Sequence, residues 1–148
     1  MTIWVDADAC PVIARDILFK ACQRTHTELR LVANQFIKTP PASHISSIVV
    51  EKGFDIADDY IAANCVVGDL VITSDIPLAA EVLAKGADAL NPRGDAYDRS
   101  SIRAQLTMRD FMDTMRASGE RTGGQKAYGQ KEKQAFANAL DRWLAKAT

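Results

Sequence analysis

The chain has 148 residues, of which 47% are hydrophobic and 25% are charged. This length suits a single domain with a core that needs no disulfide or metal to fold, and the composition excludes a disordered, collagen-like or coiled-coil chain. The formal net charge of −1, taken alone, argues against a nucleic-acid-binding protein covered in positive charge.

Short apolar segments alternate with helical patterns along the chain, which favours a parallel sheet in a Rossmann-like, three-layer α/β/α fold. The predicted strands are 2–5, 29–33, 45–50, 70–73 and 87–90. The predicted helices are one that starts near Pro11, 57–65, 77–85, one from Ser100 or Ser101 to about Ala117, and 131–147. Proline in the first turn and glycine after the last turn support these helix ends.

A polar stretch with several glycines, Ser118 to Gly124, separates the last predicted helix from the rest of the chain. Phe136, Leu140 and Leu144 lie on one face of that helix, as in an amphipathic helix that packs on a core. We expect residues 1–117 to form the α/β domain. Residues 118–148 are expected to be a flexible segment and a C-terminal helix docked on the same domain.

Cysteine usage and the absence of apolar runs predict a cytoplasmic protein. Cys10, Cys22 and Cys65 are odd in number and lack CxxC spacing, which is typical of reduced thiols. Asp6 comes before any secretory apolar stretch could form, and no run approaches the roughly 20 apolar residues of a membrane span. We therefore expect no membrane partner.

Acidic residues follow two of the predicted strands. Asp6 and Asp8 come at the end of the first strand and Asp75 at the end of the fourth, where ligands bind in open α/β sheets. Carboxylates that meet there need a cation, and Mg²⁺ or Mn²⁺ prefer oxygen ligands. Such a metal would activate water and stabilise charge on a phosphoryl group. The full set of candidate metal ligands is Asp6, Asp8, Asp58, Asp59, Asp69 and Asp75. As an alternative, Asp8, Asp58 and Asp75 are ordinary helix N-caps.

The net charge of −1 hides a division along the chain. Residues 1–98 hold 8 Lys and Arg against 14 Asp and Glu, a net of −6, whereas residues 99–148 hold 10 against 5, a net of +5. A basic segment beside an acidic metal site would suit a phosphodiester such as RNA, although charged helix faces are usually only solvated. The candidate substrate-binding residues are Asn34, Arg93, Arg99 and Arg103.

Four stretches resemble the signature sequences of the YaiI/YqxD family of bacterial proteins, and together they span most of the chain. They are DADACP from Asp6, VANQ from Val32, GDLVITSDIPLA from Gly68 and NPRG from Asn91. More distantly, the layout resembles PIN-domain nucleases, in which a first-strand Asp, an acid opening a later helix and a Thr-x-Asp hold metal. This resemblance implies that Asp6, Asp58 and Asp75 are catalytic ligands of Mg²⁺ or Mn²⁺, that residues 1–117 are a PIN-like domain, and that the protein is a ribonuclease or related phosphodiesterase.

Two alternatives stay open. The glutamate that PIN nucleases usually carry has no match here, which favours a non-catalytic PIN-like module that binds RNA or a protein. In addition, the sequence from Ile3 to Asp8 resembles the opening motif of haloacid-dehalogenase-type phosphatases. By that resemblance Asp6 would be the nucleophile and Asp8 the general acid and base.

Overall fold

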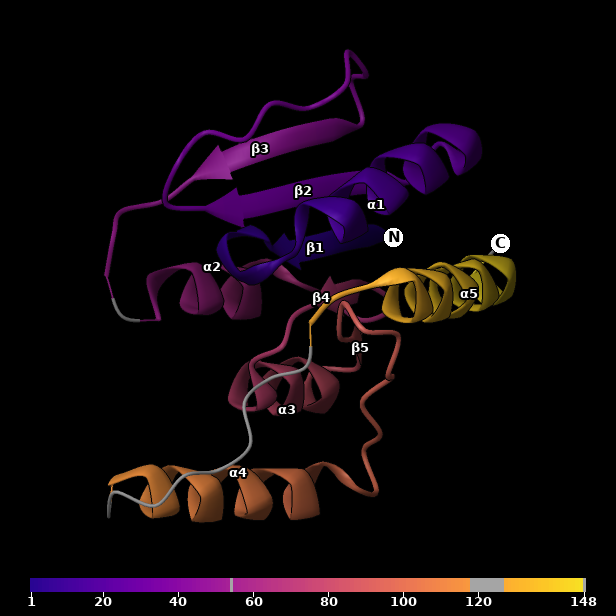
Figure 1. Ribbon diagram of the computed structural model, residues 1–148. Coiled ribbons are helices and arrows are strands. Elements are labelled where there is room, and N and C mark those ends of the chain that lie inside the picture. Colours follow the sequence, from indigo (N-terminus) through magenta and orange to yellow (C-terminus); the bar gives the residue numbers. More distant parts are fainter. Residues whose placement is uncertain (54, 118–126, 148) are drawn as a thin grey trace.

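A computed structural model describes residues 1–53, 55–117 and 127–147, with side chains left out of the description for 111–117. Its centre is a five-stranded parallel sheet in the order β3-β2-β1-β4-β5 (Figure 1). The strands are β1 (Thr2–Asp6), β2 (Glu28–Ala33), β3 (Ile45–Val49), β4 (Leu70–Ile72) and β5 (Asp88–Leu90). The helices are the 3-10 turn η1 (Ala7–Ala9), α1 (Val12–Thr25), α2 (Ile56–Asn64), α3 (Ile76–Ala84), α4 (Ile102–Ala117) and α5 (Gln130–Ala147). The predicted α/β class with a C-terminal helix is confirmed.

Each face of the sheet is covered by helices, because successive side chains of a strand point to opposite faces. In β1, Ile3 and Val5 face the core formed with α1 and α5, and Trp4 faces the core formed with α2 and α3. All three side chains are buried. A strand that is apolar on both faces is what a parallel sheet between two helical layers requires.

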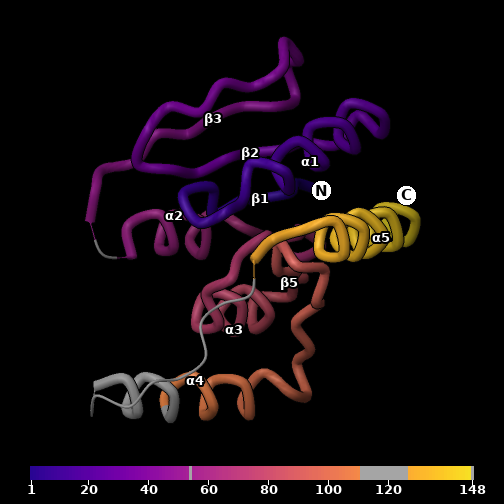
Figure 2. Tube along the Cα trace, viewed as in Figure 1, coloured from indigo at the N-terminus to yellow at the C-terminus, as the bar shows by residue number. Residues whose placement is uncertain are grey.

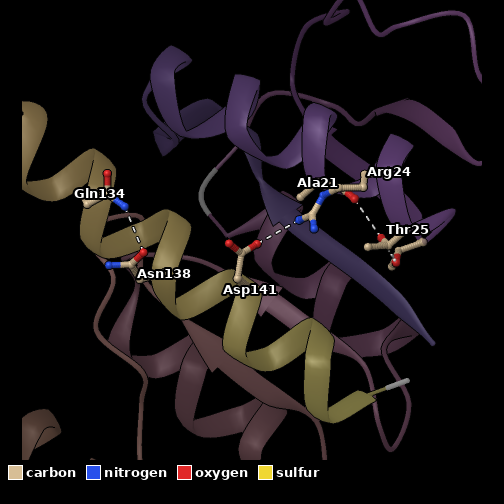
Figure 3. Close-up of polar contacts among 7 residues, drawn as sticks. Ala21, Arg24, Thr25, Gln134, Asn138 and Asp141 are labelled. Atoms are coloured by element: carbon tan, nitrogen blue, oxygen red, sulfur yellow. Dashed lines mark hydrogen bonds and ion pairs between the residues drawn. The ribbon is translucent and has the colours of Figure 1, made fainter.

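The C-terminal helix α5 packs against α1 and the sheet. Phe136 and Leu140 are fully buried in the same core as β1 and α1, so apolar burial holds the helix in place. At the surface, Arg24 of α1 contacts Asp141 of α5 at 3.0 Å (Figure 3), an exposed ion pair that adds little to stability. The predicted flexible stretch from Ser118 to Gly124 lies within residues 118–126, which are outside the described residues.

The predicted elements match the observed ones to within about two residues at their ends, with two local differences. The turn η1 was not predicted, and it places two alanines between β1 and the first long helix. Pro11 is the N-cap of α1, with ψ at 145°, so the helix begins at Val12 and not at the proline. Within the described residues, no helix is both long and apolar enough to cross a bilayer.

Candidate functional site

The centre of the sheet is the point where strand order reverses. The chain leaves β1 for α1 on one face and leaves β4 for α3 on the other face (Figure 2). Because β1 and β4 are parallel neighbours, Asp6 and the residues after Ile72 meet at the carboxyl edge of the sheet. This is the position at which open α/β sheets bind ligands.

Hydrogen bonds fix Asp6 and Asp75 at this edge. The Thr73 hydroxyl donates to Asp6 Oδ2 at 3.2 Å, and it accepts the backbone N–H of Asp75 at 3.0 Å. Asp75 caps α3, since its Oδ1 accepts the backbone N–H of Leu78 at 2.9 Å. The threonine therefore links the two acids, and the cap leaves the second oxygen of Asp75 for another partner.

The α2 helix brings two further acids to the same place. Asp55 is its N-cap residue and Asp58 lies three positions on, so both are on the first turn. One oxygen each from Asp55, Asp58 and Asp75 lie within 4.8 Å of one another. These acids line a cavity of about 230 Å³, together with Asp59, Leu78 and the α4 residue Arg109 among others.

Burial and neighbouring negative charges raise the pKa values of two acids at this edge, Asp58 and Asp6. The pKa of Asp58 is raised to about 7, first by burial and then by the negative charges of Asp6 and Asp75. Burial also raises the pKa of Asp6, which the hydrogen bond from Thr73 opposes and the charges of Asp75 and Asp8 reinforce. Both carboxyl groups are therefore harder to ionise than an exposed one, because burial weakens their hydration and neighbouring acids repel their negative charge.

Two of the other predicted ligands lie near this cluster without joining it. Asp8 is exposed, and its Oδ2 accepts the backbone N–H of Asn34 at 2.8 Å. This contact joins the turn after β1 to the end of β2. Asp59 is exposed and lines the cavity.

Asp69 is at the other end of the sheet. It precedes β4, is only 2% exposed, and accepts N–H groups from Thr2, Trp4 and Val66 at 2.9–3.0 Å. With three protein donors on its two oxygens, this carboxylate ties the amino ends of β1 and β4 together. The structure thus separates Asp69 from Asp75 by the length of β4.

The candidate substrate-binding residues do not converge on one surface. Asn34 is next to Asp8, as described above. Arg93 lies 3.7 Å from Glu132, while Arg99 donates to the carbonyls of Leu83 and Ala87. Arg103 is exposed in the first turn of α4. The side chain of Arg116, and Arg121 and Lys126 of the basic segment, lie outside the described residues.

Sequence reasoning missed three charged residues of the cavity, Asp55, Glu81 and Arg109, as site residues. Asp55 has a left-handed backbone with φ of 61°, a conformation that Asp tolerates better than most residues. Its spacing of three from Asp58, which puts both on one helix turn, was the available signal. Nothing in the sequence pairs Arg109 with acids that lie 28 to 54 positions earlier.

Fold and site together define an α/β protein with an acidic cluster at the carboxyl edge of a parallel sheet. The chain matches the model of the "Uncharacterized BCR, YaiI/YqxD family" over residues 4–146. It is 68% identical to a UPF0178 protein of Pseudoalteromonas atlantica over 145 residues, which covers 98% of this chain and 99% of the relative. A UPF0178 protein of Thioalkalivibrio sulfidiphilus is 62% identical over 146 residues, with 99% of each chain covered.

A UPF0178 protein of Klebsiella pneumoniae is 59% identical over 144 residues, covering 97% of this chain and 95% of the relative. The protein therefore belongs to the YaiI/YqxD family. No solved structure was found to match the chain.

Proposed function

We propose that this protein is a phosphodiesterase that depends on Mg²⁺ or Mn²⁺ and cleaves RNA, on a domain of PIN-like type. The main support is the group of carboxylate oxygens from Asp55, Asp58 and Asp75 within 4.8 Å, with Asp6 held beside them through Thr73. Asp6, Asp58 and Asp75 are the proposed primary ligands. Asp55 is added to them from the geometry.

The donor set suits a hard divalent cation. Mg²⁺ and Mn²⁺ favour carboxylate oxygens and keep several waters, and the cavity of about 230 Å³ leaves room for water and a phosphoryl group. Burial, and then repulsion from Asp6 and Asp75, raise the pKa of Asp58 to about 7. A cation beside it would favour the charged form, so metal binding should release a proton near neutral pH.

A metal bound here would lower the pKa of a water and stabilise charge on the phosphoryl oxygens. The protein contributes orientation: Thr73 holds Asp6, and the α3 cap holds Asp75. Arg109 adds a positive charge on the wall of the cavity, where a guanidinium can donate to phosphate oxygens. Asp58, if it retains its proton, hydrogen-bonds to Asp75, so proton release from Asp58 would accompany metal entry.

The phosphatase alternative ranks lower because of Asp8. Asp8 is the general acid in that alternative, but its Oδ2 already accepts the backbone N–H of Asn34, just after β2, at 2.8 Å. A haloacid-dehalogenase-type enzyme would also turn over small phosphomonoesters and trap beryllofluoride on Asp6. The proposed phosphodiesterase would do neither.

The test combines Mn²⁺ titration by calorimetry with cleavage of a labelled single-stranded RNA in Mn²⁺ or in EDTA. Asp6→Asn and Asp75→Asn should each weaken Mn²⁺ binding at least tenfold and lower cleavage by two orders of magnitude or more. Asparagine keeps the α3 cap, so a loss in Asp75→Asn cannot be assigned to helix fraying. Asp141→Asn, on the exposed surface of α5, is the matched control and should retain both properties.

Cleavage that survives both substitutions, or that continues in EDTA, would refute the metal-dependent phosphodiesterase. Metal binding or RNA binding with no cleavage by the wild type would instead support the non-catalytic module.

A further inference from the structure

A second cavity opens at the same edge of the sheet, between α1 and the segment that follows β2. It has a volume of about 330 Å³. We call it the Phe36 pocket, after its most exposed aromatic residue. It is lined by Val12, Arg15, Asp16, Phe19, Gln35, Phe36, Ile37 and Lys38.

Phe36 is 74% exposed because its neighbour is anchored in the core. Ile37 is 7% exposed and packs in the core beneath α1, and its backbone N–H donates to the Ser47 hydroxyl at 3.2 Å. Two positions before Phe36, the backbone of Asn34 is bound by Asp8. Because the chain is fixed on both sides of it, the ring is displayed to solvent on a fixed backbone, which lowers the entropy cost of binding a flat partner.

The charges of the pocket suit an anion. Arg15 and Lys38 line it against one acid, Asp16. Arg15 Nε is buried, and within the described residues nothing accepts its hydrogen bond. The buried Nε is closed to a ligand, but Arg15 also lines the cavity, and a guanidinium can form charge-assisted bonds to phosphate oxygens through its terminal N–H groups.

The hydrogen bond between Asp8 and Asn34 lies between Asp6 and the Phe36 pocket along the carboxyl edge of the sheet. Asp8 is two residues after Asp6, the proposed metal ligand, and it binds the Asn34 N–H. Gln35, the next residue, already lines the Phe36 pocket. In the sheet Asp6 of β1 is paired with Val32 of the neighbouring strand β2, two positions before Asn34. The Phe36 pocket therefore begins at the end of the strand next to the one that carries Asp6.

We infer that the Phe36 pocket holds one nucleotide of a single-stranded RNA, with its base stacked on Phe36 and its phosphate bound by Arg15 and Lys38. An exposed aromatic ring next to cations is how proteins bind single strands without reading their sequence. The inference deepens the proposed function and rests on it, since the same strand would pass from this pocket over the turn after β1 to the metal site. An apolar protein partner would use the ring but not the excess positive charge of Arg15 and Lys38 over Asp16.

The test measures binding of a fluorescein-labelled single-stranded RNA decamer by anisotropy in EDTA, where the proposed metal is absent. Replacing Phe36 by alanine should weaken binding about five- to a hundredfold, the range for loss of one stacked base, and Phe36→Trp should restore it. Val67→Ala is the matched control, because Val67 is 76% exposed but precedes β4 at the opposite edge of the sheet; it should bind as the wild type does. Lys38→Gln should weaken binding and reduce its dependence on salt.

The inference would be overturned if Phe36→Ala bound the RNA decamer within twofold of the wild-type affinity. It would also be overturned if the wild type did not bind the decamer at about 100 μM. A change in oligomeric mass on Phe36→Ala, with unchanged RNA binding, would identify the surface as a protein contact and also overturn it. Failure of the proposed function looks different. In that case no cleavage that depends on Asp6 and Asp75 would be detected, while RNA binding in EDTA would still depend on Phe36.

Discussion

Replacing Asp58 by asparagine is expected to stabilise the metal-free protein at neutral pH and to change little in acid. In the folded protein the pKa of Asp58 is raised from 3.8 to about 7, by burial and by Asp6 and Asp75. Between these two values the folded state binds more protons than the unfolded state, so the free energy of unfolding falls as the pH rises. Asparagine removes the charge and can still donate a hydrogen bond to Asp75.

The magnitude follows from the pKa. A rise from 3.8 to about 7 corresponds to about 4 kcal/mol if the carboxylate were fully sheltered. Asp58 is only half-buried, so solvent screening reduces the expected gain to about 1–2 kcal/mol above pH 7. For a protein of this size each kcal/mol shifts the melting temperature by about 2–4 °C.

The assay is thermal unfolding of wild type, Asp58→Asn and the surface control Asp141→Asn in EDTA at pH 4 and at pH 7.5. Asp58→Asn should melt several degrees above the wild type at pH 7.5 and close to it at pH 4. If Asp58→Asn melts at the same temperature as the wild type at pH 7.5, or below it, the charged form of Asp58 does not destabilise the folded protein and the reasoning is refuted. In saturating Mn²⁺ the order should reverse, since only the wild type retains the ligand.

Three further predictions concern stability and thiol chemistry. Asp69→Ala, which leaves one buried and two partly buried N–H donors without their acceptor, should lower the free energy of unfolding in urea by about 3 kcal/mol. A loss under about 1 kcal/mol would contradict the proposed role of Asp69 in holding β1 and β4 together. Gly94→Ala should lower the free energy of unfolding by more than about 2 kcal/mol in the same assay, because φ is +97° and the new Cβ would lie 2.6 Å from the α5 backbone. Gly68→Ala is the control, since it has a φ of +91° but open space around the new Cβ, and it should cost about 1 kcal/mol. Equal losses would refute the argument that α5 approaches Gly94 too closely for a side chain. Burial raises the pKa of Cys10 and of Cys22 to about 12, so neither thiol should react with iodoacetamide at pH 8 until urea unfolds the chain. Alkylation of either cysteine in the folded protein, detected by mass spectrometry, would contradict this prediction.

The fold was predictable because local signals agreed with one another. The apolar run from Leu70 to Ile72 could only be a strand buried on both faces, and the prolines and glycines around α3 marked its ends. Placement of Asp6 and Asp75 at one edge then followed from parallel topology alone. Asp58 was predicted only through the resemblance to PIN-domain nucleases, and no local signal showed that the first turn of α2 and its N-cap Asp55 lie at that edge.

Asp69 shows where sequence reasoning fails. An acid next to a strand is equally compatible with a metal site and with a structural brace, and the choice depends on which donors surround it. Here the donors come from Thr2 and Trp4, 67 and 65 positions away. Their positions depend on tertiary packing that neither propensity nor periodicity encodes.

The strand order has a consequence for how the chain folds. During synthesis β1, β2 and β3 emerge first, and β2 can pair with one edge of β1 and then with β3. The other edge of β1 stays open until β4 emerges, more than 60 residues after β1. An open strand edge is a template for pairing with other chains. The face covered by Phe136 and Leu140 of α5 is completed later still. The half-made sheet is thus the species most exposed to aggregation, and the bond from Thr2 to Asp69 is among the first contacts that can end that exposure.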